Sequence, residues 1–307
     1  MKGRGLIALG FLILSVYAAY GQQEALYSQY IFNLYALNPA YAGARDALSV
    51  NGSYRAQWVG FEGAPSTQNF NIHAPLRNEN MAVGLYFQND QIGARRASHM
   101  AFAYAYSLRL DKDARRKINF GLQAGAISYQ YDWDALDYQN PGDPVAFSTD
   151  GNFWLPSFDF GVMYIAPKAY LGLSATGLQN SRLYSSVSDD ARLSTFLNLQ
   201  AGYIHSLSDQ IDIKPFGLVR HELGGPVQVD LGLSTLLMNH LWLGAIYRHD
   251  FGMVFSAQVV TSQSLVIGYA YDWAINGLRA AQSATHEVYL GIDLSLFKAD
   301  KVGVRYF

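Results

Sequence analysis

The side chains of this 307-residue chain that could do acid–base or metal chemistry are 7 histidines and 24 acidic residues. The histidines are scattered, at positions 73, 99, 205, 221, 240, 249 and 286. His221-Glu222 begins like a zinc-protease motif, but the second histidine of that motif is replaced by Gly225. Ser98 and His99 with a nearby acid would form part of a lipase site, although isolated Ser-His neighbours are common. The spacing therefore predicts neither a metal site nor a catalytic group.

Other chemistry is excluded by what the sequence lacks. It contains no phosphate-binding loop, no nucleophile elbow and no dinucleotide fingerprint after a strand. The absence of cysteine excludes disulfides, thiol nucleophiles, thiolate metal sites and an acylated cysteine anchor. A net charge of −2 gives no electrostatic reason to expect a nucleic-acid partner. We therefore predict a protein that is not an enzyme, needs no cofactor and binds no nucleic acid.

The N-terminus has the pattern of a secretory signal peptide. Lys2 and Arg4 supply the positive start, residues 6–19 form an apolar core, and Ala19-Tyr20-Gly21 is a small-x-small cleavage site. The apolar core is shorter than the roughly 20 residues that a membrane-spanning helix needs. We expect removal of residues 1–21, which leaves Gln22 as the new N-terminus of an exported protein.

Alternation of apolar and polar residues is the main structural signal from residue 48 onward. Within 48–58, one parity is apolar and the other polar: Leu48, Val50, Gly52, Tyr54, Ala56 and Trp58 against Ser49, Asn51, Ser53, Arg55 and Gln57. The pattern recurs at 69–74, 227–234 and 287–295. Successive side chains of a β-strand point to opposite faces, so each segment has one apolar and one polar face.

About 14 segments follow this period, each near the 9–11 residues that a tilted membrane strand needs. Their predicted bounds are 47–58, 66–75, 81–89, 97–110, 117–131, 156–166, 169–178, 193–205, 210–220, 226–237, 240–248, 252–261, 264–273 and 285–297. A change of parity near Ile127 predicts a β-bulge in the fifth segment.

The connections between these segments sort by length. The longest follow odd-numbered segments, at 59–65, 90–96, 132–155, 179–192 and 274–284, and those after even-numbered segments are short or charged. Bacterial outer-membrane barrels have long loops at one end and short turns at the other. The predicted fold class is therefore all-β: a transmembrane antiparallel up-and-down β-barrel of the outer-membrane type, over residues 47–297. A secreted β-sandwich is the alternative, because its strands also have one apolar face.

Two stretches lie outside the alternating pattern. Residues 22–46 include the proline-set turn at Asn38-Pro39 and are expected to plug the lumen or its periplasmic mouth. Residues 298–307 are expected to form a short C-terminal tail. The polar parity of the strands places five charged or polar side chains in the lumen, as solvated or paired lining: Arg55, His73, Asp230, Asp272 and Glu287.

An ordered set of short motifs resembles the PorP/SprF family. Ser28-Gln29-Tyr30 and Asn38-Pro39-Ala40-Tyr41-Ala42-Gly43 are similar to its N-terminal signature. Further similar motifs follow in order: Arg55-Ala56-Gln57-Trp58, Ala64-Pro65-Ser66-Thr67, Asn89-Asp90-Gln91-Ile92-Gly93, Ala103-Tyr104-Ala105-Tyr106, Tyr170-Leu171-Gly172-Leu173-Ser174, Gly268-Tyr269-Ala270-Tyr271-Asp272 and His286-Glu287-Val288. One departure is Phe32-Asn33-Leu34-Tyr35, where the family pattern has a proline soon after the asparagine.

The resemblance implies an outer-membrane barrel of the type IX secretion and gliding machinery of Bacteroidetes-type bacteria. It implies as partners other type IX components, among them a periplasmic peptidoglycan-binding protein, or a large secreted adhesin with a C-terminal sorting domain. Of these two roles we favour the dedicated adhesin partner. The family brings no catalytic residues with it.

Aromatic residues are the candidate partner contacts, because they are good interface anchors. On the predicted loop 132–155 they are Trp133, Tyr138, Phe153 and Trp154, and in the N-terminal stretch the candidates are Tyr30, Asn38, Pro39 and Tyr41. Folding of the loop inward over the barrel mouth is the alternative reading of its aromatics. The alternative functions are a passive outer-membrane porin and a barrel enzyme acting on lipid, and the second lacks a visible catalytic cluster.

Overall fold

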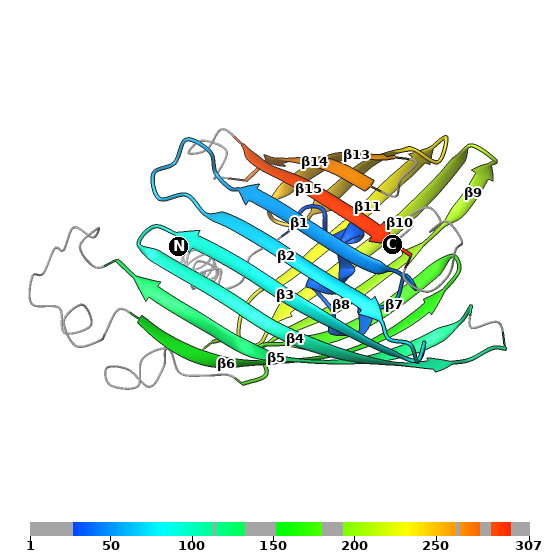
Figure 1. Ribbon diagram of the computed structural model, residues 1–307. Helices are drawn as coiled ribbons and strands as arrows, with labels where there is room; N and C mark the ends of the chain where they lie inside the picture. The colour runs from blue at the N-terminus through cyan, green and yellow to red at the C-terminus, as the bar shows by residue number, and fades with distance from the viewer. Residues whose placement is uncertain are drawn as a thin grey trace, which may run out of the picture.

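The computed structural model describes residues 27–112, 115–132, 152–179, 193–261, 265–276 and 284–295. Three short 3-10 helices come first, and fifteen strands follow (Figure 1). The helices are η1 Tyr30–Phe32, η2 Leu34–Ala36 and η3 Pro39–Tyr41. The strands are β1 Leu48–Ala56, β2 Ser66–Pro75, β3 Met81–Ile92, β4 Arg95–Arg109, β5 Lys117–Tyr131, β6 Asn152–Ala166, β7 Ala169–Thr176, β8 Phe196–Tyr203, β9 His205–Ser208, β10 Ile211–Glu222, β11 Val227–Leu237, β12 Leu241–Arg248, β13 Gly252–Val260, β14 Leu265–Ala274 and β15 Thr285–Leu294.

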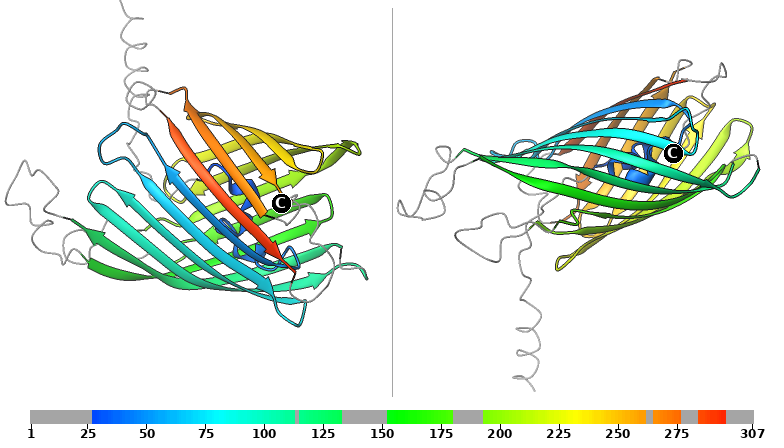
Figure 2. Two further views of the ribbon diagram at one scale, coloured as in Figure 1. Left: turned by 45° about the horizontal axis from the view of Figure 1, so that its top comes forward. Right: turned by 60° about the horizontal axis from the view of Figure 1, so that its bottom comes forward.

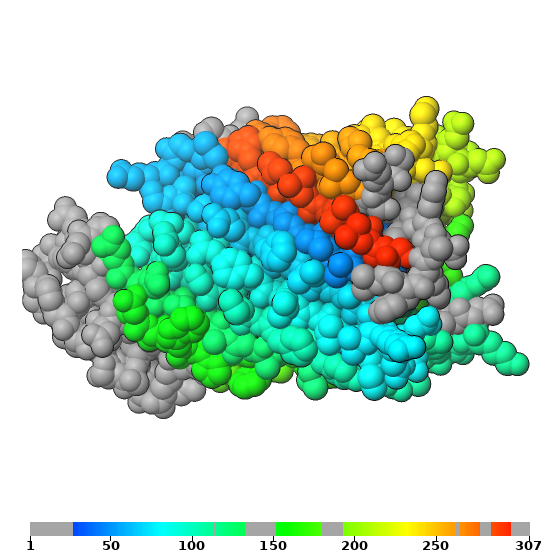
Figure 3. All heavy atoms as spheres, in the orientation of Figure 1, coloured from blue at the N-terminus to red at the C-terminus, as the bar shows by residue number. Residues whose placement is uncertain are grey.

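The strands form one closed antiparallel barrel. Each strand pairs with its neighbours in sequence, except that β8 pairs with β10 and not with β9. β15 pairs with β1, which closes the sheet. The space-filling view shows β15 lying directly against β1 (Figure 3). β8 and β9 are separated only by Ile204 and both pair with β10, so together they occupy one of 14 strand positions. The predicted up-and-down barrel of about 14 strands is confirmed.

The two ends of the barrel differ. We call the end that carries the connections after β1, β3, β5, β7, β10, β12 and β14 the loop end, and the opposite end, where β1 begins, the turn end. At the turn end β6 and β7 are joined by Pro167 and Lys168 alone. At the loop end the connection between β7 and β8 spans 177–195. The walls are uneven as well, since β4, β5 and β6 have 15 residues each whereas β7 and β8 have 8.

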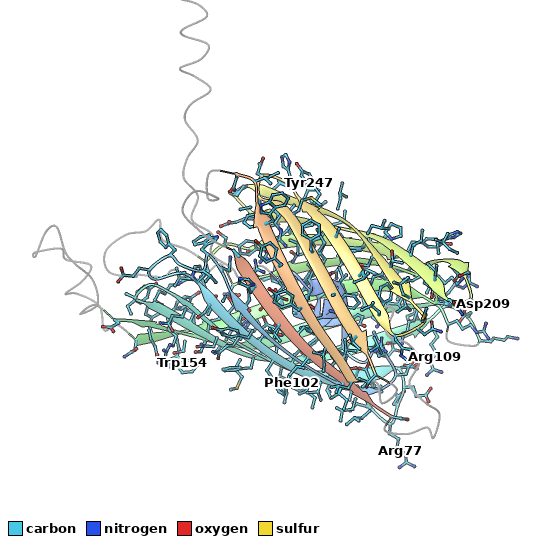
Figure 4. The ribbon with its side chains drawn as sticks, turned by 90° about the horizontal axis from the view of Figure 1, so that it is seen from above. Arg77, Phe102, Arg109, Trp154, Asp209 and Tyr247 are labelled. Atoms are coloured by element: carbon cyan, nitrogen blue, oxygen red, sulfur yellow. The ribbon has the colours of Figure 1, made fainter. Side chains whose placement is uncertain are left out.

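The barrel is apolar outside and polar inside. In β2, Phe70 is 48% exposed on the outer face, whereas its neighbours Asn69 and Asn71 are buried in the lumen. Figure 4 shows the same outward direction for Phe102 and Tyr247, while Arg77, Arg109 and Asp209 gather at the turn end. A bilayer supplies no hydrogen-bond partners, so an apolar outer band on a closed sheet is the arrangement that lipid requires. In the described part of the chain no helix is long and apolar enough to cross a membrane.

The expected loop at 90–96 is wrong. β3 and β4 run to Ile92 and from Arg95, and Gly93-Ala94 alone connects them. Gly93 has φ +53°, which a tight hairpin turn uses and glycine adopts at little cost. The polar run Asn89-Asp90-Gln91 resembles a loop in sequence because both of its faces are polar. Its main chain nevertheless pairs with β4 throughout.

Three other details also differ from expectation. No β-bulge occurs at Ile127, because β5 pairs with β4 and β6 in an unbroken register. The residues of β5 that face the lumen become apolar at Ile127 and Tyr129. In the sequence this looks like a change of parity. The eighth predicted strand, 193–205, corresponds to β8, and the short strand β9 follows it, with a register shift at Ile211/Asp212 in its pairing with β10. β6 begins at Asn152, so Phe153 and Trp154 are strand residues and not loop residues.

Residues 27–46, which we call the lumenal segment, lie inside the barrel. Both views of Figure 2 show the η helices surrounded by strands. The first half of the segment packs against β10–β15 in one apolar cluster that includes Tyr30, Phe32 and Trp242. The second half packs against β3, β4, β6 and β7 in another cluster that includes Tyr35, Ala40 and Tyr41. The segment therefore spans the lumen from one wall to the opposite wall.

Candidate functional site

The turn at Asn38-Pro39 is formed by local chemistry. Pro39 is the first residue of η3, where its missing N–H is not needed and its fixed φ suits the helix. The Asn38 side chain caps this helix by accepting a hydrogen bond of 3.0 Å from the Ala40 amide. Gly43 then turns the chain with φ +69°, in the left-handed region that favours glycine. This is why the sequence from Asn38 to Gly43 forms a compact hook.

The wall opposite this hook is lined with glycines. A Cβ atom at Gly121 would collide with the backbone of Pro39 and Ala40, and one at Gly161 would collide with the Asn38 side chain. Asn38 also donates to the Leu173 carbonyl at 3.1 Å, and the Asn119 side chain donates to the Ala40 carbonyl at 3.0 Å. The hook is thus held by close backbone approach as well as by hydrogen bonds, which only small wall residues permit.

The other half of the segment is held by charged groups of the wall. The amides of Ser28 and Gln29 donate to the two carboxylate oxygens of Glu287, at 2.6 and 3.0 Å. The Ser28 hydroxyl donates to Asp272 at 2.5 Å and accepts from Arg55. Charge-assisted bonds of this kind are stronger than neutral ones.

These wall groups form a buried ion cluster of Arg55, Arg248, Asp230, Asp272 and Glu287. Arg55 lies 2.7 Å from Asp272 and 3.3 Å from Glu287. Arg248 lies 3.0 Å from Asp230 and 3.5 Å from Asp272, and it also donates to the Tyr27 carbonyl at 3.2 Å. All five side chains are at most 3% exposed. Buried charges need such pairing and additional hydrogen bonds, some of which the lumenal segment supplies here.

The structure brings four of the five predicted lumenal residues together. Arg55, Asp230, Asp272 and Glu287 all belong to the ion cluster. His73 lies apart, beside the hook: its Nδ1 accepts from the Gly43 amide at 3.2 Å, and its ring lies 5.1 and 5.6 Å from the rings of Tyr35 and Tyr41.

Sequence reasoning missed several buried cations, Arg248 and Lys214 among them. Both faces of β12 are apolar up to Tyr247, so alternation gave no sign that Arg248 points inward. Lys214 lies on β10, where Asp212 and Lys214 share the inward parity and could have indicated it. Its Nζ lies 4.5 Å from the Phe32 ring centroid and 4.9 Å from that of Trp242. This cation–π contact attaches η1 to the wall.

The predicted partner-contact residues fall into three groups. Tyr30, Asn38, Pro39 and Tyr41 are all buried in the lumen, where a partner reaches them only if the segment leaves. Trp154 points outward at the loop end (Figure 4) and is 69% exposed. Phe153 instead stacks on Tyr129, which is buried in the lumen. Trp133 and Tyr138 lie outside the described residues. Among the described residues, no three acidic or histidine side chains are grouped to hold a metal ion.

Comparison with solved structures finds other membrane barrels. The outer membrane protein Omp33 of Acinetobacter baumannii is 9% identical, with a TM-score of 0.45 over 81% of this chain and 98% of that one. A monoaromatic hydrocarbon channel, CymD, is 13% identical, with a TM-score of 0.46 over 89% and 94%. BamA of Haemophilus ducreyi lacking POTRA domains 1–3 is 8% identical, with a TM-score of 0.43 over 81% and 70%. No curated protein sequence matches.

The family comparison covers most of the chain. The model that matches residues 19–292 describes the type IX secretion system membrane protein PorP/SprF. The match includes the lumenal segment, every residue of the ion cluster and all strands but the last two residues of β15. The chain is a membrane protein of the PorP/SprF family of the type IX secretion system, with an outer-membrane β-barrel fold.

Proposed function

We propose that this barrel is a non-enzymatic part of the type IX machinery that assists the export or surface attachment of one large secreted adhesin with a C-terminal sorting domain. The observation that carries the proposal is the occupied lumen. The lumenal segment spans the barrel and is held at one end by the ion cluster and at the other by the glycine-lined wall. A passive porin needs an open lumen, so this arrangement argues for protein contact rather than for free diffusion.

The loop end is the proposed contact surface. Outer-membrane barrels of bacteria have their longer loops outside the cell, so the loop end would face the surface. The wall formed by β4–β6 is the longest part of the barrel, and Trp154 is exposed on its outer side. A large exposed aromatic side chain is a suitable anchor for a partner. Contact with periplasmic machinery, including a peptidoglycan-binding protein, would use the turn end instead.

Affinity purification from the native outer membrane tests this proposal. A tagged chain, extracted in mild detergent, should recover a large secreted protein with a C-terminal sorting domain, identified by mass spectrometry. Trp154→Ala should reduce that recovery about tenfold or more, as expected for an interface anchor. Trp273→Ala is the matched control, because Trp273 is also exposed at the loop end but lies on β14, away from this wall.

Three other outcomes would change the assignment of the chain or of its contact surface. Recovery of type IX core proteins without an adhesin would assign the chain to the core machinery. Recovery of the barrel alone, together with steady ion conductance, would favour the porin. Equal recovery of the secreted protein by both tryptophan variants would show that the β4–β6 wall is not part of the contact surface.

A further inference from the structure

A cavity of about 90 Å³ lies between the lumenal segment and the strands β3–β8. Its floor is the chain from Tyr35 to Pro39, and its upper lining includes Gly177, Gln179 and Leu193 of the connection between β7 and β8. A single buried water needs about 10–15 Å³ of such space, so the cavity has room for a small molecule. Its position is toward the loop end of the lumen.

Four polar atoms of this lining have no hydrogen-bond partner: Tyr35 Oη, His99 Nε2, Gln123 Oε1 and Thr176 Oγ1. Tyr35 and Gln123 are 2% and 8% exposed. Buried polar groups in proteins are nearly always paired, so unpaired groups that line one cavity indicate a ligand or water that pairs with them. The set contains hydroxyls, which donate and accept, and an amide oxygen, which only accepts. The complementary ligand therefore offers both donors and acceptors.

The charged groups of the lining are already paired with the protein. Asp90 accepts from the Thr67 hydroxyl at 2.6 Å and lies 3.3 Å from Arg95. Asp159 accepts from the Gln123 amide nitrogen at 2.7 Å and from the Gly177 amide at 2.9 Å. Both carboxylates of the lining therefore already have hydrogen-bond partners in the protein, which favours a neutral ligand.

Aromatic rings complete the lining and continue from it toward the rim. Tyr86, Tyr129 and Phe196 line the cavity itself. Tyr129 stacks on Phe153, with ring centroids 5.3 Å apart, and Phe153 stacks on Tyr131 at 6.2 Å. Ring faces pack against C–H groups, while the neighbouring polar atoms bind hydroxyls, which is the amphipathic combination that a sugar presents.

We propose that this cavity binds a neutral carbohydrate, with one saccharide unit in the cavity and further units directed along the ring stack of Tyr129, Phe153 and Tyr131. A peptide is the less suitable occupant, because both carboxylates of the lining already accept hydrogen bonds from the protein and neither is free to bind a peptide N-terminus.

Calorimetric titration of the purified full-length chain tests this site. The protein should be kept in a detergent without a sugar headgroup, because a maltoside or glucoside would compete. Glucose, galactose, mannose, N-acetylglucosamine and their disaccharides are the probes, with a neutral capped tripeptide beside them. We expect saturable one-to-one binding of at least one sugar, and tighter binding of a disaccharide than of its monosaccharide.

Two variants locate the binding in the cavity. Thr176→Val removes one unpaired hydroxyl at constant shape, and Tyr35→Phe removes another. Each should weaken sugar binding about tenfold, the usual effect of losing one hydrogen bond to a bound ligand. Ser234→Ala is the control, since Ser234 Oγ is also buried and unpaired but lies outside the cavity. The proposal is overturned if no sugar binds, if the tripeptide binds instead, or if all three variants bind sugar like the native chain.

Discussion

Arg55 connects the ion cluster to the lumenal segment. It forms ion pairs with Asp272 and Glu287 and contacts Ser28. Arg55→Met should leave buried carboxylates uncompensated. The packing of the lumenal segment inside the barrel should then lose about 3–5 kcal/mol of stability. Chymotrypsin digestion followed by mass spectrometry should then show cleavage within residues 27–46.

Arg109→Met is the control for that substitution. Arg109 forms an ion pair of 3.0 Å with Glu79, but both side chains are exposed at the turn end. Exposed pairs contribute about 0–1 kcal/mol, so this variant should resist chymotrypsin as the native chain does. Equal protection of both variants would show that the ion cluster does not hold the segment.

Two buried tyrosines of the lumenal segment predict that the protein loses stability at alkaline pH. Burial raises the pKa of Tyr30 and of Tyr35 above the ordinary value of about 10. The folded state therefore keeps both hydroxyls neutral, and this contribution to stability is complete below about pH 10 and is lost as the pH rises further. Thermal unfolding temperatures should fall between pH 10 and pH 12.

Tyr35→Phe should reduce that fall, because it removes one of the two hydroxyls that ionise. The Tyr35 hydroxyl has no hydrogen-bond partner, so its removal breaks no hydrogen bond. Tyr54→Phe, a half-exposed residue of the outer face, should leave it unchanged. An identical alkaline profile for all three proteins would contradict the assignment of the effect to the lumenal segment.

Some residues of the ion cluster could be predicted from the sequence of their strands, and others could not. Arg55, Asp272 and Glu287 lie on the lumen-facing parity of alternating segments, so their inward direction was visible in the sequence. Arg248 follows a stretch that is apolar on both faces, because the lumen there contacts the apolar side of η1. Which inward residues meet each other depends on strand order around the closed barrel, and one sequence carries no signal for that.

At the scale of the elements, the hook of the lumenal segment needs a small residue opposite it. Gly121→Leu should displace Pro39 and Ala40 while the barrel still forms, because the new side chain has no other space. Chymotrypsin should cut the displaced segment, and the barrel should remain heat-modifiable on gels. Gly52→Leu is the matched control: a Cβ at Gly52 meets no atom closer than 3.9 Å. If the segment stays protected in Gly121→Leu, the hook is not held by this wall.

The strands were predictable where the two faces differ, and less so elsewhere. Period-2 alternation located β1, β2 and β11 to within a residue or two because a lipid face and a lumen face demand different side chains. Beyond the apolar band both faces are polar, so the ends of β3 and β4 resembled a loop. The lumenal segment shows no periodic alternation of apolar and polar residues. Its 3-10 turns are formed by Pro39, glycine and contacts with the barrel wall, so alternation could not predict them.

The apolar outer band determines where the whole molecule can tolerate a charge. Phe102 lies in the middle of β4, on the outer face, and is 52% exposed. Phe102→Arg should destabilise the barrel in lipid by about 2–4 kcal/mol, the cost of arginine at the bilayer midplane. Folding into vesicles, followed by gel mobility without heating, measures this loss.

Leu110→Arg provides the comparison, because Leu110 is similarly exposed but follows the end of β4 at the turn end. The cost there should be about 0–1 kcal/mol. Similar losses for both variants would place the bilayer elsewhere on the barrel than on its apolar band.

Residues 27–46 occupy the lumen of this type IX secretion barrel and should close it to ions. Ion conductance across planar bilayers tests whether they do. The native chain should show no steady open-pore current, and Gly121→Leu or Arg55→Met should produce one by displacing the segment. A native chain that conducts steadily, at a level that neither substitution changes, would show that residues 27–46 do not close the lumen.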